Sequence, residues 1–108
     1  MKLLTKDIKA RFAKVPWRST DAKPHDEVKV IAKFFHPCSR WTFYATEFDG
    51  LDIFFGYVHS AMGYDSDEWG YVSLTELQNM QVGKLGVERD ISWNPETTVA
   101  EVLAGVRT

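Results

Sequence analysis

The chain has 108 residues, 44% of them hydrophobic, which is the size and composition of one folded domain spanning residues 1–108. Its net charge of −2, with basic residues spread along the sequence, lacks the concentrated basic stripe typical of nucleic-acid-binding proteins. Cys38 is the only cysteine, which excludes an internal disulfide, and no apolar run approaches the roughly 18 residues of a membrane span. Because the start also turns polar too early for a signal peptide, we expect a cytoplasmic protein without a membrane partner.

A helix is predicted near the N-terminus. Thr5 is a suitable N-cap residue, because its side-chain oxygen can accept a hydrogen bond from the first turn. Leu4, Ile8 and Phe12 follow at i, i+4 and i+8, the spacing of one apolar helix face. Pro16 ends this helix, since the residue before a proline disfavours the helical conformation. Residues 15–27 have no apolar period and are expected to form a loop.

Four strands are predicted in the centre of the chain. Period-two alternation and many β-branched and aromatic residues indicate strands over residues 28–36, 41–48, 52–59 and 69–72. Asp49 and Gly50 form a hairpin signal between the second and third strands. Gly56, inside the third strand, indicates a bulge or a close approach of two backbones. Short connections without an intervening helix imply antiparallel pairing.

The last third of the chain returns to helix. Ser73 with Glu76, and again Thr98 with Glu101, fit the capping box that opens a helix. We therefore predict a short helix to about residue 80 and a C-terminal helix, with a fifth strand over residues 87–93 between them. The expected fold class is α+β. It consists of an antiparallel meander of four to five strands with an N-terminal helix, a short helix after the fourth strand and a C-terminal helix.

Strict alternation divides the aromatic side chains between two faces of this sheet. The first face is expected to carry Trp41, Phe43, Phe55, Tyr57, Trp69 and Tyr71, with Glu47 beside Phe43. The second face is expected to carry Tyr44, Phe48, Phe54 and Val72. Two arrangements stay open. Either helices cover both faces, or one face exposes its rings as an interaction surface.

Several segments resemble one known family. They are residues 1–6, 33–35, the decapeptide WTFYATEFDG at 41–50, and residues 54–56, 70–77 and 87–90. Together they resemble a small family catalogued only as domain of unknown function 2958, over residues 1 to about 95. The decapeptide is specific, whereas the segment 70–77 alone would not be.

This resemblance implies an origin on bacterial plasmids, integrative elements or phages, often among antirestriction and DNA-transfer genes. It implies no catalytic residues, because no activity comes with the family. The chain departs from the usual pattern in a longer loop at residues 60–68 and a longer C-terminal helix. If that loop contacts a partner, the partner is expected to differ here.

The acidic residues Glu47, Asp49 and Asp52 are the candidates for a metal or acid–base site, since hard cations need several converging oxygen ligands. Turn chemistry explains Asp49 beside Gly50 without any metal. We therefore favour structural roles and expect no metal and no cofactor. The three histidines also lack the spacing of transition-metal ligands.

We expect a non-enzymatic module that binds a bacterial protein through an aromatic, partly acidic sheet face and the loop at residues 60–68. The candidate binding residues are Trp41, Tyr44, Glu47, Asp49, Tyr57, His59, Tyr64, Glu68, Trp69, Tyr71 and Arg89. One alternative is a small metal-dependent enzyme that uses the three carboxylates, with or without His59. The other is single-stranded nucleic acid stacked on the rings, which Arg40 and Arg89 support only thinly. A monomer, or a weak homodimer through sheet extension, is expected.

Overall fold

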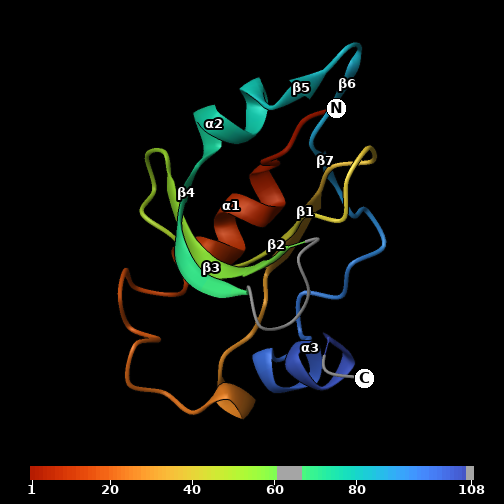
Figure 1. Cartoon of the computed structure of the whole chain (residues 1–108). Helices are drawn as coiled ribbons and strands as arrows, with labels where there is room; N and C mark the ends of the chain where they lie inside the picture. Colours follow the sequence, from red (N-terminus) through yellow and green to blue (C-terminus); the bar gives the residue numbers. More distant parts are fainter. Residues whose placement is uncertain (61–66, 107–108) are drawn as a thin grey trace.

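The computed structural model describes residues 1–60 and 67–106, and a curved antiparallel sheet of five strands organises them (Figure 1). The strands are β1 (Ala32–Phe35), β2 (Thr42–Phe48), β3 (Ile53–His59), β4 (Glu68–Ser73) and β7 (Glu88–Arg89), arranged in the order β4-β3-β2-β1-β7. Together with the three α-helices below, this meander confirms the predicted α+β fold class.

The N-terminal and C-terminal helices begin at the predicted caps. In α1 (Lys6–Ala13), the Oγ1 atom of Thr5 accepts a hydrogen bond from the backbone N–H of Ile8 at 3.3 Å. In α3 (Val99–Val106), Thr98 and Glu101 form a reciprocal capping box, with donor–acceptor distances of 3.2 and 3.0 Å. Among the described residues, no helix combines the length and the apolar character that a membrane crossing requires.

The helix α2 (Leu74–Asn79) is capped differently from the prediction. Ser73 accepts from the backbone N–H of Glu76 at 3.1 Å, as expected. The carboxylate at this cap comes instead from Asp52 in the β2–β3 hairpin, which accepts from the Ser73 hydroxyl at 2.7 Å and from the backbone N–H of Thr75 at 3.0 Å. Tertiary structure thus replaces half of a local motif.

Two predicted strands are shorter in the structure. Residues 28–31 do not belong to β1, because the Val30 N–H donates to Thr97 at 2.7 Å and the carbonyl of Val28 accepts from Val99 at 2.8 Å. After β7 the chain turns at Asp90, so the predicted strand over residues 87–93 keeps only two residues. The structure adds a 3₁₀ turn (His25–Glu27) and a small hairpin of β5 (Gln81–Val82) and β6 (Leu85–Gly86) that the sequence did not predict.

Apolar side chains pack on both faces of the sheet. Figure 1 shows α1 against one face and α3 beyond the other. The larger core, on the α1 face, includes Phe12, Phe34, Phe43, Phe54 and Leu77. The smaller core, on the α3 face, includes Val30, Tyr44, Tyr57, Val99 and Leu103. The α3 face is where the site described below is built.

The predicted division of the aromatic side chains between the faces is wrong for Trp41, Phe43 and Tyr44. Phe43 packs with Phe48 and Phe54 toward α1, whereas Tyr44 lies opposite Tyr57 on the α3 face. The first reason is the register between β2 and β3, which the alternation within each single strand does not determine. The second is a β-bulge, because the register shifts between Ala45 and Glu47. One extra residue reverses the side chains that follow it.

The bulge moves Glu47 to the α3 face, opposite Phe55, and turns Phe48 inward toward α1. Next to it, Gly56 allows the close backbone approach that the sequence indicated. A Cβ atom on Gly56 would lie 2.1 Å from the carbonyl oxygen of Tyr44. The predicted set of Phe55, Tyr57, Trp69 and Tyr71 does share one face, since the pairing of β3 with β4 is regular.

Candidate functional site

Four aromatic side chains form a partly exposed surface on the α3 face of β3 and β4. This aromatic surface consists of Trp17, Phe55, Trp69 and Tyr71. Ring centroids lie 6.0 Å apart for Trp17 and Tyr71, 5.7 Å for Phe55 and Trp69, and 5.2 Å for Phe55 and Tyr71. Trp17 and Trp69 are each 38% exposed, and Tyr71 is 59% exposed. Contiguous aromatic groups left in contact with water are typical of interaction surfaces.

A hollow of about 260 Å³ adjoins the aromatic surface under the loop that precedes β1. It is lined by Thr20, Asp21, Lys23, His25, Val28, Phe55 and Trp69. The ring of His25 lies 5.7 Å from that of Trp69 and forms one wall. The volume is below that of typical small-molecule pockets, roughly 300–1,000 Å³, and suits one large side chain of a partner.

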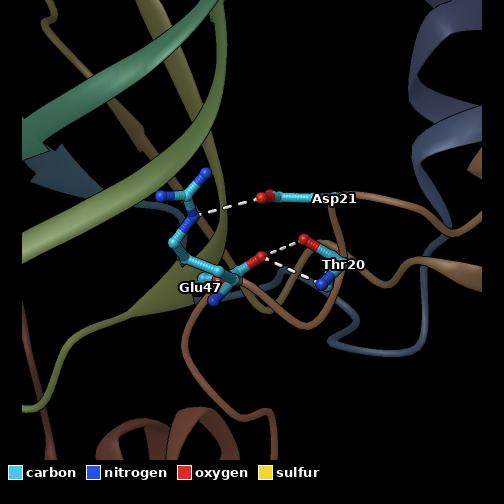
Figure 2. Close-up of polar contacts among 4 residues, drawn as sticks. Thr20, Asp21 and Glu47 are labelled. Carbon is cyan, nitrogen blue, oxygen red and sulfur yellow. Dashed lines mark hydrogen bonds and ion pairs between the residues drawn. The ribbon is translucent and has the colours of Figure 1, made fainter.

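Glu47 fixes the loop that carries Trp17 to the sheet. Its side chain is buried, and its carboxylate accepts hydrogen bonds from the backbone N–H of Arg18 and from the backbone N–H and hydroxyl of Thr20 (Figure 2). Figure 2 also shows Asp21, which accepts from Nε of Arg18 at 3.2 Å. The interactions of Glu47 therefore hold one wall of the hollow in place.

Arg18 adopts a left-handed backbone conformation to make this contact. Its φ of +69° is unusual for a residue with a side chain and costs on the order of 1 kcal/mol or more. Three donors converge on Glu47 in return, and a buried carboxylate requires such partners. The pairing explains why an acidic residue occupies a buried position near the end of β2.

Asp49 and Asp52 also serve local structure. One oxygen of Asp49 accepts from the backbone N–H groups of Leu51, Asp52 and Ile53 at 2.8–3.0 Å and thus closes the hairpin. Burial raises the pKa of Asp49, but these backbone hydrogen bonds outweigh it and leave the pKa below its ordinary value.

Asp52 accepts from Ser73, and from the backbone N–H and hydroxyl of Thr75 at 3.0 and 2.8 Å. The hydrogen bonds from Ser73 and Thr75 lower the pKa of Asp52. The three carboxylates proposed for a metal site thus have separate partners. In the part of the chain that the structure describes, no three acidic, histidine or cysteine side chains converge as metal ligands.

The strand β4 forms one edge of the sheet, beside the aromatic surface. The backbone N–H of Leu74 donates to the carbonyl of Asp52 at 2.7 Å, so at this position the polar main-chain groups face β3. Because this direction alternates along an antiparallel strand, Trp69 and Tyr71 direct their N–H and C=O groups away from β3. No described strand pairs with them there.

A second polar cluster joins the end of β3 to the start of β4. Asp67 has a buried carboxylate that accepts from the Tyr57 hydroxyl at 2.7 Å, lies 2.7 Å from Nδ1 of His59, and accepts from the Ser60 backbone N–H at 3.0 Å. Burial raises the pKa of Asp67, but the hydrogen bonds from His59 and Tyr57 outweigh it and keep the pKa below its ordinary value.

The predicted binding residues therefore separate into groups. Trp69 and Tyr71 belong to the aromatic surface, and the exposed Glu68 begins the same strand. Tyr44, Tyr57 and His59 lie on the same sheet face.

The remaining predicted residues lie elsewhere or serve the fold. Trp41 stacks on Phe43 on the opposite face, with ring centroids 6.3 Å apart. Arg89 belongs to β7, at the far edge of the sheet, and Glu47 and Asp49 serve the loop and the hairpin. Tyr64 falls outside the described residues, together with most of the loop at residues 60–68.

Trp17 and His25 were missed by sequence reasoning because they belong to a loop without a period. The available signal was a tryptophan in a segment that has no helix or strand in which to bury it. Asp67 was likewise interpreted only as part of a polar loop.

One family model matches this sequence. It describes a protein of unknown function, DUF2958, and matches residues 3–107. The chain belongs to this family. The match confirms the resemblance inferred from the central decapeptide, and it extends through the C-terminal helix that the resemblance left out. No curated protein and no solved structure matches the chain.

Proposed function

We propose that the protein is a non-enzymatic interaction module that binds an extended segment of another protein along the free edge of β4. One observation supports this proposal. Trp69 and Tyr71 both have exposed rings, and their backbone N–H and C=O groups point outward, where no described strand pairs with them. A row of alternating donors and acceptors is complementary to another β-strand. The side chains of such a segment would lie beside the aromatic surface.

The sequence of β4 supports this use of its edge. Exposed edge strands are commonly protected by lysine, proline or a bulge. The strand EWGYVS contains neither lysine nor proline, and its pairing with β3 shows no shift of register. Its edge therefore retains the regular geometry that a pairing segment requires.

The charges around the aromatic surface favour a protein over nucleic acid. Asp21, Asp26 and Glu27 are exposed on the loop beside this surface and outnumber its exposed Lys23. Arg18 is already paired with Asp21. Phosphate groups would be repelled by this acidic surround, so stacking of single-stranded nucleic acid is the weaker alternative.

The proposed partner is a bacterial protein of a host defence or DNA-transfer system, met in the cytoplasm. This part rests on the plasmids and phages that the family resemblance implies, by association alone. The proposed binding itself depends on β4 and does not require that setting.

A displayed library of random 16-residue peptides tests the proposal. We expect selected peptides to share alternating apolar side chains. Trp69→Ala and Tyr71→Ala should each weaken their binding about tenfold or more, because exposed aromatic anchors dominate such contacts. The matched control is Ile91→Ala, an apolar side chain that is 76% exposed elsewhere on the molecule and should bind as the wild type does.

Two results would overturn the proposal. One is a library that yields no peptide above background, or peptides that bind both variants as tightly as the wild type. The other is a sedimentation experiment in which the molecular mass rises to that of a dimer as the protein concentration increases, whereas Tyr71→Lys stays a monomer. In that case a second copy of the chain occupies the edge.

A further inference from the structure

A second hollow lies on the same sheet face, between the sheet and α3, away from the aromatic surface. Its volume is about 410 Å³, within the range of small-ligand pockets. Its lining includes Tyr44, His59, Trp93, Thr97, Glu101 and Val102. The function proposed above uses none of these residues, and we call this hollow the α3 cleft.

His59 lines the α3 cleft, and its contact with Asp67 fixes the orientation of its ring. The carboxylate of Asp67 lies 2.7 Å from Nδ1, and an ionised carboxylate can only accept, so this contact favours the tautomer with the proton on Nδ1. In the neutral imidazole the other nitrogen, Nε2, is then an acceptor. Nε2 has no hydrogen-bond partner among the described residues.

Tyr44 supplies a donor next to this acceptor. In the pairing of β2 with β3, Tyr44 lies opposite Tyr57 and Thr42 lies opposite His59, so Tyr44 and His59 are diagonal neighbours on one face. Burial, helped by the charge of Asp67, raises the pKa of Tyr44, so its hydroxyl stays protonated. Within the described part of the chain this hydroxyl also has no hydrogen-bond partner.

Trp93 gives the α3 cleft a rigid aromatic wall. Its indole N–H donates to the carbonyl of Val30 at 2.8 Å, which fixes the plane of the ring. The ring of Tyr44 lies 5.9 Å away at an angle of 52°. Flat, apolar surfaces with one donor and one acceptor suit a planar ligand that has the same two groups on its edge.

We propose that the α3 cleft binds a planar nitrogen heterocycle of the nucleobase type. The ring would lie against Trp93 and Tyr44, an amino group would donate to Nε2 of His59, and a ring nitrogen would accept from the hydroxyl of Tyr44. The carboxylate of Glu101 lines the cleft and disfavours a phosphate. The nearest cation in the described part of the chain, Lys33, lies 5.6 Å from the Trp93 ring and is paired with Asp90 at 3.9 Å. The ligand class is therefore a free base or nucleoside rather than a nucleotide.

Titration with adenosine, followed by calorimetry and by the NMR signal of the Trp93 indole N–H, tests this inference. We expect saturable binding that shifts this signal. N6,N6-dimethyladenosine, which lacks the amino donor, and adenosine monophosphate, which adds a phosphate, should each bind at least about fivefold more weakly.

Two variants distinguish the proposed contacts from general stickiness. Tyr44→Phe keeps the ring and the fold but removes the donor, so adenosine should bind about tenfold more weakly. Ser92→Ala removes a hydroxyl from an exposed turn outside the cleft and should bind as the wild type does. No adenosine binding at millimolar concentration, or unchanged binding in Tyr44→Phe, would overturn the inference.

Discussion

At the scale of single residues, four carboxylates act as acceptors for backbone donors, those of Glu47, Asp49, Asp52 and Asp67. Glu47 is the clearest case. A buried carboxylate without partners would be strongly unfavourable, so the donors of Arg18 and Thr20 are required as much as the acid itself. This explains an acidic residue in a buried strand without any catalytic role.

Glu47→Gln should lower the free energy of unfolding by about 1–3 kcal/mol, because the new amide NH₂ would face donors that need an acceptor. Denaturant unfolding measures this change. Hydrogen exchange at the Thr20 amide should become faster at the same time, since the loop loses its attachment to β2. Glu68→Gln, at an exposed position, is the matched control. Equal stability of Glu47→Gln and the wild type would contradict the role assigned to Glu47.

The pKa of Asp52 predicts an acid-sensitive fold. Because its pKa in the folded state lies below the ordinary value of 3.8, the folded protein binds this proton more weakly than the unfolded chain does. The stabilisation is therefore complete above the ordinary value and is lost as the pH falls toward the folded-state value.

We expect the thermal midpoint to fall as the pH decreases from about 5 to about 2. In Asp52→Asn the midpoint should be lower near neutral pH and should fall less steeply with acid. Asp49, Asp67 and Glu96, whose pKa values are also lowered, contribute to the remaining slope. If the thermal midpoint of Asp52→Asn fell with acid as steeply as that of the wild type, Asp52 would not contribute to the acid sensitivity.

At the scale of elements, the contact of β2 with β3 depends on two neighbouring irregularities, the bulge at residues 45–47 and Gly56. Gly70, which lies opposite Gly56 in β4, provides a matched comparison. A Cβ atom on Gly56 would collide with the main chain of Tyr44, whereas one on Gly70 would meet nothing within 4 Å.

Gly56→Ala should therefore destabilise the protein by about 2–4 kcal/mol, and Gly70→Ala should change its stability by less than about 0.5 kcal/mol. Urea unfolding of both variants under the same conditions measures the difference. Similar effects at the two glycines would mean that β2 and β3 are not as close as described.

The same elements show which parts of the fold can be predicted from sequence. Helix starts such as Thr5 and Thr98 depend on neighbours within four residues, so their pattern was sufficient. The relative register of two strands and the bulge before Glu47 depend on contacts between segments, which alternation within one strand does not contain. The division of the rings between the faces was wrong for that reason.

The candidate site could be predicted only in part. Trp69 and Tyr71 were identified because their strand is regular and its period is clear. Trp17 and His25 join them through a loop that Glu47 holds in place. Glu47 lies in β2, 27–29 residues along the chain from the loop residues that donate to it. A contact between residues so far apart in the sequence leaves no periodic signal.

At the scale of the whole molecule, the two faces of the sheet differ in how completely they are covered. The α1 face is closed by the larger core, while the α3 face carries the α3 cleft at one end and the aromatic surface at the other. The edge of β4 borders the aromatic surface, so backbone pairing and side-chain contacts could be made by one partner segment at the same time.

Hydrogen exchange at the backbone amides of β4 tests the central claim most directly. In the free protein, the amides of Trp69 and Tyr71 should exchange faster than those of Gly70 and Val72, which bond to β3. With a selected peptide bound, exchange at Trp69 and Tyr71 should slow at least about tenfold, since the peptide backbone would accept their hydrogen bonds. Tight peptide binding that leaves exchange at these two amides unchanged would contradict the account.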